Sequence, residues 1–72
     1  MFESNFYMDA ATKAAHAERT GAFTYAEQLW ESAAYSAVSK LNRHWAQARA
    51  DFCRRQYDLS QIENWEQEVV NV

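Results

Sequence analysis

The chain has 72 residues, with ten acidic and seven basic side chains and a formal net charge of −3. A chain of this length forms one small domain and buries only about 60% of its unfolded surface, so its core alone gives marginal stability. An acidic chain is poorly suited to nucleic acid, where phosphate neutralisation supplies most of the affinity, and no apolar run approaches the roughly 18 residues of a membrane span.

The cysteine and aromatic content indicates the cellular compartment and whether the chain associates with another protein. One cysteine excludes an internal disulfide, and with no signal-peptide pattern at the start of the chain we expect a reducing, cytoplasmic setting. Three Trp, four Tyr and four Phe are more than a 72-residue monomer easily hides. The composition therefore predicts a homodimer or a protein partner.

A first helix is predicted over residues 1–19, with Ser4 as its N-cap. Alanines recur along one side of it at helical spacing, including Ala10, Ala14 and Ala17. A stripe of small side chains offers a seat for a bulky neighbour, and Trp30 is the natural occupant.

The only glycine, Gly21, separates this helix from a second one predicted over residues 25–40. Glycine reaches the positive φ that a residue just after a helix needs, and Thr24 with Glu27 reads as a capping box for the second helix. The spacing is that of half a tetratricopeptide unit, which predicts an antiparallel hairpin. We expect a structural core of Ala14, Ala17, Gly21, Phe23, Ala26, Leu29, Trp30, Ala33, Trp45 and Cys53.

Two further helices are predicted after the hairpin. Asn42 is the expected N-cap of a third helix over residues 43–57. Ser60 and Glu63 form a second capping box, which predicts a short, acidic, amphipathic helix over residues 60–72. A heptad-like apolar seam follows the third helix and continues past it: Leu41, Trp45, Ala48, Phe52 and Leu59. The expected fold is all-α, a single domain over residues 1–72.

Charge is distributed unevenly along the chain. Residues 1–39 carry a net charge of −3, residues 40–55 carry +4, and residues 56–72 carry −4. A basic helix followed by an acidic one favours their pairing, within the chain or across a dimer, although exposed ion pairs of this kind contribute little stability.

The sequence offers no pattern for a catalytic or metal site. His16 and His44 lack the spacing of metal ligands, and His44 and Cys53 diverge around one predicted helix. Cys53 is expected to be a small packed hydrophobe, and a single glycine rules out a glycine-rich phosphate loop. We therefore expect a protein that is not an enzyme and binds no cofactor or metal.

The arginines of the third helix do not form one basic face. On a helical wheel Arg43 and Arg54 face solvent, whereas Arg49 and Arg55 flank the apolar seam. An apolar seam edged by arginines is typical of a protein–protein contact rather than a DNA-reading helix. The predicted partner-binding residues are Arg49, Phe52, Arg55, Tyr35, Trp65 and Val69.

A set of spaced residues within about 10–56 resembles the AraC negative regulator (ANR) family of small bacterial transcription regulators. The distinctive parts are Leu29-Trp30 after the turn and the spaced group from Trp45 to Cys53. The full pattern is Ala17, Glu18, Gly21, Phe23, Ala26, Leu29, Trp30, Ala33, Asn42, Trp45, Arg49, Phe52, Cys53 and Arg55.

This resemblance implies a helical, self-associating protein, of a kind common in enteric pathogens and mobile elements. Such a protein binds an AraC/XylS-type activator and blocks its dimerisation or promoter binding. The resemblance also implies action through nucleoid-associated silencing proteins for some members. Two alternatives stay open: a small DNA-binding regulator that uses the helix over residues 43–57, and a phage or plasmid adaptor with another protein partner.

Overall fold

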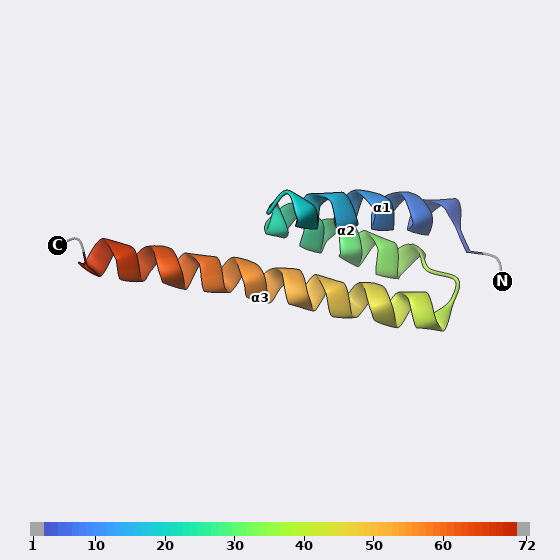
Figure 1. Ribbon diagram of the computed structural model, residues 1–72. Coiled ribbons are helices and arrows are strands. Elements are labelled where there is room, and N and C mark those ends of the chain that lie inside the picture. The colour runs from blue at the N-terminus through green and yellow to red at the C-terminus, as the bar shows by residue number, and fades with distance from the viewer. Residues whose placement is uncertain (1–2, 71–72) are drawn as a thin grey trace.

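The computed structural model describes residues 3–70, with side chains described as far as residue 62, and this part of the chain is helical without a strand. The helices are α1 (Asn5–Arg19), α2 (Phe23–Ser36) and α3 (Lys40–Val70). α1 and α2 run in opposite directions side by side, and α3 follows the other side of α2 (Figure 1). The prediction of an all-helical chain is confirmed.

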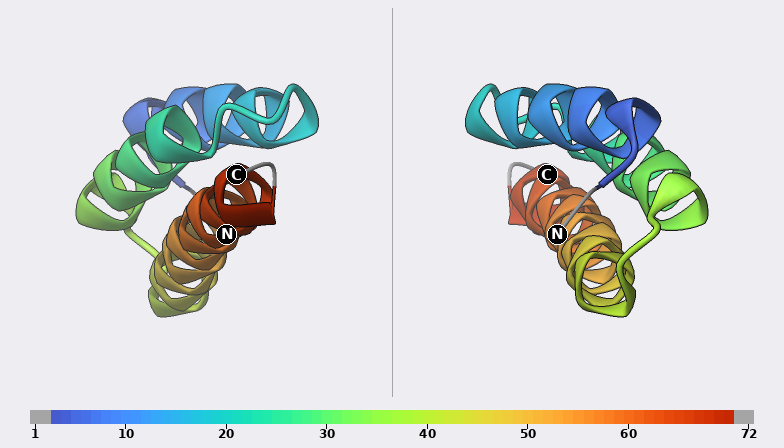
Figure 2. Two further views of the ribbon diagram at one scale, coloured as in Figure 1. Left: turned by 90° about the vertical axis from the view of Figure 1, so that its left-hand side faces the viewer. Right: turned by 90° about the vertical axis from the view of Figure 1, so that its right-hand side faces the viewer.

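α2 holds the bundle together. It packs against both α1 and α3, whereas α1 and α3 contact each other much less. Seen along the helices, the three form a bent layer with α2 at the bend, and α1 and α3 face each other across its inner side (Figure 2). Met8 on α1 and Leu41 and Trp45 on α3 line a groove between these two helices, and each is more than half exposed.

Both ends of α1 are closed by local hydrogen bonds. The Ser4 hydroxyl accepts a hydrogen bond from the Tyr7 backbone N–H at 3.0 Å, so the predicted N-cap is confirmed. At the other end Gly21 has φ +80°. The Ala22 N–H donates to the Ala17 carbonyl at 2.9 Å and the Gly21 N–H to the Glu18 carbonyl at 3.1 Å, which is a Schellman motif.

The start of α2 differs from the prediction. The helix begins at Phe23, and its N-cap residue, Ala22, makes no side-chain cap hydrogen bond. Thr24 therefore lies inside the first turn, and the predicted Thr24–Glu27 capping box is wrong. α2 also ends at Ser36 rather than Lys40, because Ala37 takes an extended conformation with ψ 132°.

A single carboxylate, that of Glu3, organises the connection from α2 to α3. It accepts hydrogen bonds from the backbone N–H groups of Val38 at 2.7 Å and Ser39 at 3.1 Å. It also accepts one from the Asn42 side-chain amide at 2.8 Å. Beside it, the Ser4 hydroxyl donates to the Ser36 carbonyl at 2.8 Å. The segment before α1 thereby fastens the end of α2 and the start of α3.

α3 starts earlier and runs further than the sequence predicts. Ser39 rather than Asn42 precedes the helix, and its hydroxyl accepts from the Asn42 N–H at 3.3 Å. The helix continues through Ser60 without a break, so the predicted separate helix over residues 60–72 is not confirmed. A capping-box pattern inside a favourable helical sequence does not interrupt the backbone hydrogen bonds on its own.

The core is built mainly from alanines around two aromatic side chains, Trp30 and Tyr7. Trp30 is only 4% exposed, and the small side chains around it let the helices approach closely. Phe23 and Leu29 are partly buried at the margin of the core. The buried residues are Tyr7, Ala14, Ala17, Ala26, Trp30, Ala33, Ala34, Ala37, Ala46, Ala50 and Cys53.

α3 packs on the core with a different face from the one that the sequence predicts. Trp45, predicted to lie in the core, is 55% exposed, and Leu41 is 78% exposed. The buried side of α3 is instead formed by Ala46, Ala50 and Cys53. Three small side chains allow close packing on the alanines of α2, and the larger apolar side of α3 is left outside.

Candidate functional site

Side chains from all three helices meet at Glu18. Its carboxylate accepts hydrogen bonds from Trp30 Nε1 on α2 and from Arg49 Nε on α3, the latter at 3.2 Å. Arg49 Nη2 also forms an ion pair with Glu18 Oε1. Burial raises the pKa of Glu18, but the hydrogen bonds from Arg49 and Trp30 outweigh it and leave the pKa below its usual value. The carboxylate is therefore held in its charged form inside the bundle.

Cys53 lies beside this cluster and is fully buried. Burial is the main cause that raises the pKa of its thiol to about 11, and the neighbouring Glu18 charge acts in the same direction. A thiol that stays protonated at neutral pH is a poor nucleophile. The prediction that Cys53 packs as a small hydrophobe is confirmed by its burial.

The guanidinium of Arg49 is enclosed by aromatic rings as well as by Glu18. Its Cζ lies 4.2 Å from the centroid of the Phe52 ring and 5.7 Å from that of Trp45, both within the range of cation–π contacts. Its side chain is 28% exposed. The structure therefore places this predicted contact residue in an intramolecular cluster, with a minor part of its surface open.

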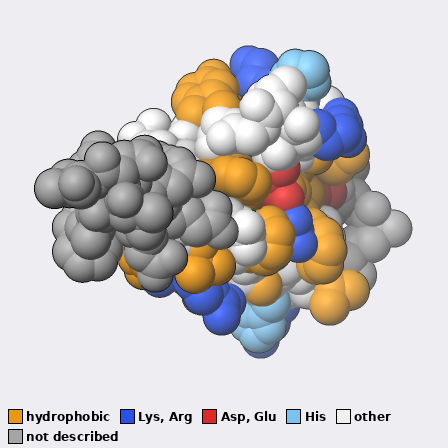
Figure 3. All heavy atoms as spheres, turned by 60° about the vertical axis from the view of Figure 1, so that its left-hand side comes forward, with side chains coloured by type: hydrophobic (Ala, Val, Ile, Leu, Met, Phe, Trp, Pro, Cys, Tyr) orange, Lys and Arg blue, Asp and Glu red, His pale blue; other side chains and the backbone are white. Residues whose placement is uncertain are grey.

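An apolar groove lies next to this cluster, between the N-terminal half of α3 and the middle of α1. We call it the α1–α3 groove. Met8 and Leu41, which line it from opposite sides, are more than half exposed, and so is Trp45. On this side of the molecule a basic and an acidic side chain meet at the centre and hydrophobic side chains surround them (Figure 3). The groove is lined chiefly by Met8, Ala11, Ala15, Leu41, Asn42 and Trp45.

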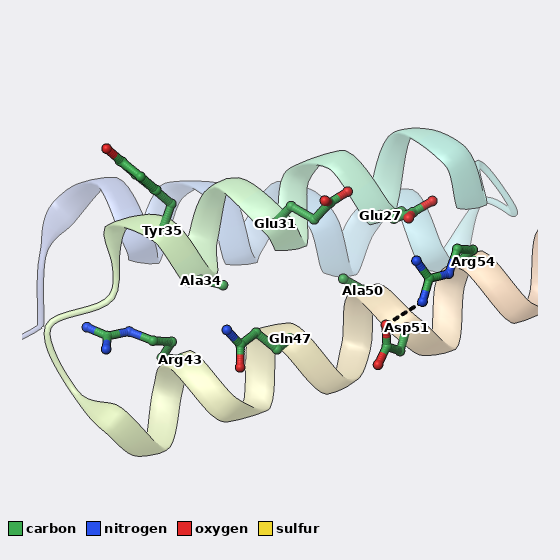
Figure 4. A pocket seen from close by; sticks show the side chains of 9 residues that line it. All are labelled: Glu27, Glu31, Ala34, Tyr35, Arg43, Gln47, Ala50, Asp51 and Arg54. Atoms are coloured by element: carbon green, nitrogen blue, oxygen red, sulfur yellow. Dashed lines mark hydrogen bonds and ion pairs between the residues drawn. The ribbon is translucent and has the colours of Figure 1, made fainter.

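A second groove, between α2 and α3, is polar. It contains Glu27 and Glu31 from α2 and Arg43 and Arg54 from α3, and Figure 4 shows these charged side chains along its two walls. Tyr35 stands at one end, with its ring pointing away from α3. At 93% exposure it is a surface residue.

The predicted contact residues are thus not brought to one place. Phe52 lies in the Arg49 cluster, Arg55 is exposed further along α3, and Tyr35 belongs to the polar groove. The side chains of Trp65 and Val69 lie outside the described residues. Comparison with protein-family models, curated proteins and solved structures finds no match. No family is therefore assigned, and the resemblance to the ANR family enters only the proposal below.

The described residues contain no group of three or more His, Cys, Asp or Glu side chains arranged to hold a metal ion. In the same part of the chain, no helix is long and apolar enough to span a membrane. The site that the geometry offers is the α1–α3 groove with the Arg49 cluster at its edge.

Met8 is not named at all in the sequence analysis, and neither Leu41 nor Glu18 is among the predicted contact residues. Leu41 was visible as the first member of the heptad-like seam, but a periodic pattern does not tell whether the core or the solvent lies beside it. Glu18 follows the buried Ala17 at the edge of the alanine stripe. Its partner lies 31 residues away on another helix, and no local pattern marks such a pair.

Proposed function

We propose that this chain is a protein-binding regulator that captures an apolar helix in the α1–α3 groove. The observation that carries the proposal is the exposure of Leu41 and Trp45 on one face, opposite Met8 on α1. Large apolar side chains gathered around a groove are typical of a surface that another protein covers. The ion pair between Glu18 and Arg49 lies at the edge of this face and connects α1 to α3.

For the partner, we propose an AraC/XylS-type transcription activator, and for the mechanism, occlusion. The chain would cover a helix or linker that the activator needs for dimerisation or DNA contact, and would act as a cytoplasmic negative regulator. The ANR-like residue pattern supports this choice of partner. The net charge of −3 supports protein rather than DNA as the bound surface.

A gel-shift titration with promoter DNA and an AraC-type activator tests the proposal. Increasing amounts of this protein should abolish the activator's shift, and the protein alone should leave the DNA unshifted. A shift by the protein alone, weakening steeply with salt, would instead identify a DNA-binding regulator. No effect on the activator would overturn the choice of partner.

Two matched variants locate the binding surface. Leu41→Asp places a charge in the α1–α3 groove at an exposed position, so we expect it to weaken inhibition about tenfold or more without loss of helix content. Tyr35→Asp introduces the same charge on the polar groove and should inhibit as the parent does. Equal inhibition by both variants would overturn the α1–α3 groove as the site.

A further inference from the structure

Three polar side chains line the α1–α3 groove among its apolar ones: Tyr7 and Thr12 on α1, and Asn42 on α3. The Thr12 hydroxyl is engaged within its own helix, where it donates to the Met8 carbonyl at 2.7 Å. The Tyr7 hydroxyl and the Asn42 side-chain oxygen have no hydrogen-bond partner among the described residues. These two atoms are therefore available to a molecule bound in the groove.

The ring of Tyr7 is buried, but its hydroxyl is open. The residue is only 5% exposed, yet no fully buried side-chain oxygen or nitrogen in the described part of the chain lacks a partner. The unpartnered hydroxyl consequently keeps an open surface, and the groove is the hollow that Tyr7 lines. Burial and the nearby Glu3 charge raise the pKa of Tyr7, so the hydroxyl keeps its proton and can donate at neutral pH.

Glu3 fixes the orientation of the Asn42 side-chain amide. A carboxylate only accepts hydrogen bonds, so the group of Asn42 that lies 2.8 Å from Glu3 Oε1 is the NH2. The pKa of Glu3 is about 2, so this carboxylate stays charged over the whole neutral range. Asn42 therefore offers the groove a fixed acceptor, its Oδ1, rather than an amide that can flip to suit either kind of partner.

We propose that the α1–α3 groove selects a helix that carries an Asn or Gln among its apolar anchors, and that the Tyr7 hydroxyl and Asn42 Oδ1 bind this side-chain carboxamide. The inference rests on the proposed function, because it names the chemistry of the helix that the groove captures. The NH2 of the carboxamide donates to Asn42 Oδ1, and its oxygen accepts from Tyr7 Oη. The apolar anchors on either side pack on Met8, Leu41 and Trp45.

Other side chains match this pair of atoms less well. A carboxylate has no donor for the Asn42 oxygen and would bring a second negative charge toward Glu3. A lysine or arginine would bury its charge in an apolar groove, where the Glu3 carboxylate already accepts four hydrogen bonds and is not free to pair with it. An apolar side chain would remove water from both polar atoms and leave them unpaired. The carboxamide satisfies both, because its donor and its acceptor are separate atoms.

Fluorescence anisotropy with labelled model peptides tests this selectivity. The probe is an amphipathic helical peptide of about 15 residues, with leucines at alternating spacings of three and four. One seam position is Gln, Leu or Glu, and it is moved in turn along the seam. At its best position the Gln peptide should bind about tenfold tighter than the Leu peptide, which leaves both polar atoms unpaired. The Glu peptide, with the shape of Gln but no donor, should also bind about tenfold more weakly than Gln.

Tyr7→Phe removes one of the two polar atoms and keeps the ring in the core. Because the hydroxyl has no partner in the free protein, the urea midpoint of unfolding should equal that of the parent. The preference for the Gln peptide over the Leu peptide should fall severalfold. Tyr35→Phe is the matched control, since it removes a hydroxyl from an exposed ring outside the groove and should leave both the midpoint and the preference unchanged.

The outcomes separate this inference from the proposed function. A Leu peptide bound as tightly as the Gln peptide, or an unchanged preference in Tyr7→Phe, would overturn the carboxamide site and leave the groove in place. A lower urea midpoint in Tyr7→Phe would mean that the hydroxyl is used inside the protein, which also overturns it. If the parent binds none of the peptides, the groove fails as a helix-binding site, and the carboxamide site fails with it.

Discussion

Glu18 on α1 and Arg49 on α3 form an ion pair between the two helices that otherwise contact each other least. The Glu18 side chain is only 14% exposed, and its second oxygen also accepts a hydrogen bond from Trp30 on α2. One carboxylate thus connects all three helices. Arg49 is for this reason a structural residue first, whatever else its open surface contacts.

Replacing Arg49 should therefore destabilise the protein. Arg49→Ala leaves the mostly buried Glu18 carboxylate without its cationic partner, which we expect to cost about 2 kcal/mol, less than a fully buried pair because both side chains keep some solvent contact. For a domain of this size that lowers the thermal midpoint by roughly 8–16 °C. Thermal unfolding followed by circular dichroism measures the shift.

The double variant Glu18→Gln/Arg49→Ala is the control for this experiment. It removes the unpaired charge as well as the pair, so it should be more stable than Arg49→Ala alone. An unchanged midpoint in Arg49→Ala, combined with lost partner binding, would mean that Arg49 acts mainly at the surface, as the sequence analysis expected.

The free energy of unfolding should fall in acid, mainly because the Glu3 carboxylate becomes protonated. The backbone hydrogen bond from Val38 is the main cause that holds the pKa of Glu3 at about 2, against an ordinary value of 4.5. The folded state thus favours the charged carboxylate, whose contribution is complete above pH 4.5 and is lost as the pH falls toward 2. The lowered pKa of Glu18 acts in the same direction.

Urea unfolding between pH 2 and pH 7 measures this dependence. Glu3→Gln should lower the urea midpoint at pH 7 and approach the parent near pH 2, where about half of the parent carboxylate is protonated and most of its contribution is lost. Glu31→Gln, at an exposed position of α2, should follow the parent throughout. A constant difference between Glu3→Gln and the parent at every pH would exclude the charge of Glu3 as the cause.

Truncation of Trp30 on α2 should destabilise the protein much more than truncation of Trp45 on α3. Trp30→Ala removes the largest side chain of a core built mainly from alanines, for which we expect a loss of about 3–5 kcal/mol. Trp45→Ala removes a half-exposed ring and should cost less than about 1 kcal/mol, mostly the cation–π contact with Arg49. Urea unfolding gives both values. Similar losses would place Trp45 in the core after all.

The features of the fold that could be predicted depend on residues close together in the sequence. Ser4 as a cap, Gly21 as the turn, and Trp30 on a seat of alanines all follow from local spacing and side-chain size, and the structure contains each of them. Local patterns fail where two of them compete. α3 has a large apolar side around Trp45 and a small one around Ala50, and the sequence analysis assigned the larger side to the core.

The packing explains why α3 turns its face of small side chains toward α2. Ala33 and Ala34 of α2 are buried, and so are Ala46 and Ala50 of α3, and small side chains on both helices let them approach closely. The roles of Glu3 and Glu18 were beyond prediction for a different reason. Glu3 binds Val38 and Glu18 binds Arg49, each more than 30 residues away, and the sequence around both reads only as helix start or helix end.

Gly21 allows a test of backbone conformation without any change in packing. A methyl group added at this position meets nothing within 4 Å, so Gly21→Ala introduces no clash. Its φ of +80° nevertheless costs an L-residue about 1 kcal/mol or more, which lowers the thermal midpoint by roughly 4–8 °C. Gly21→Asn should lose less, because asparagine tolerates the left-handed region better. Equal stability of glycine and alanine would mean that the Schellman motif relaxes to a conformation with negative φ.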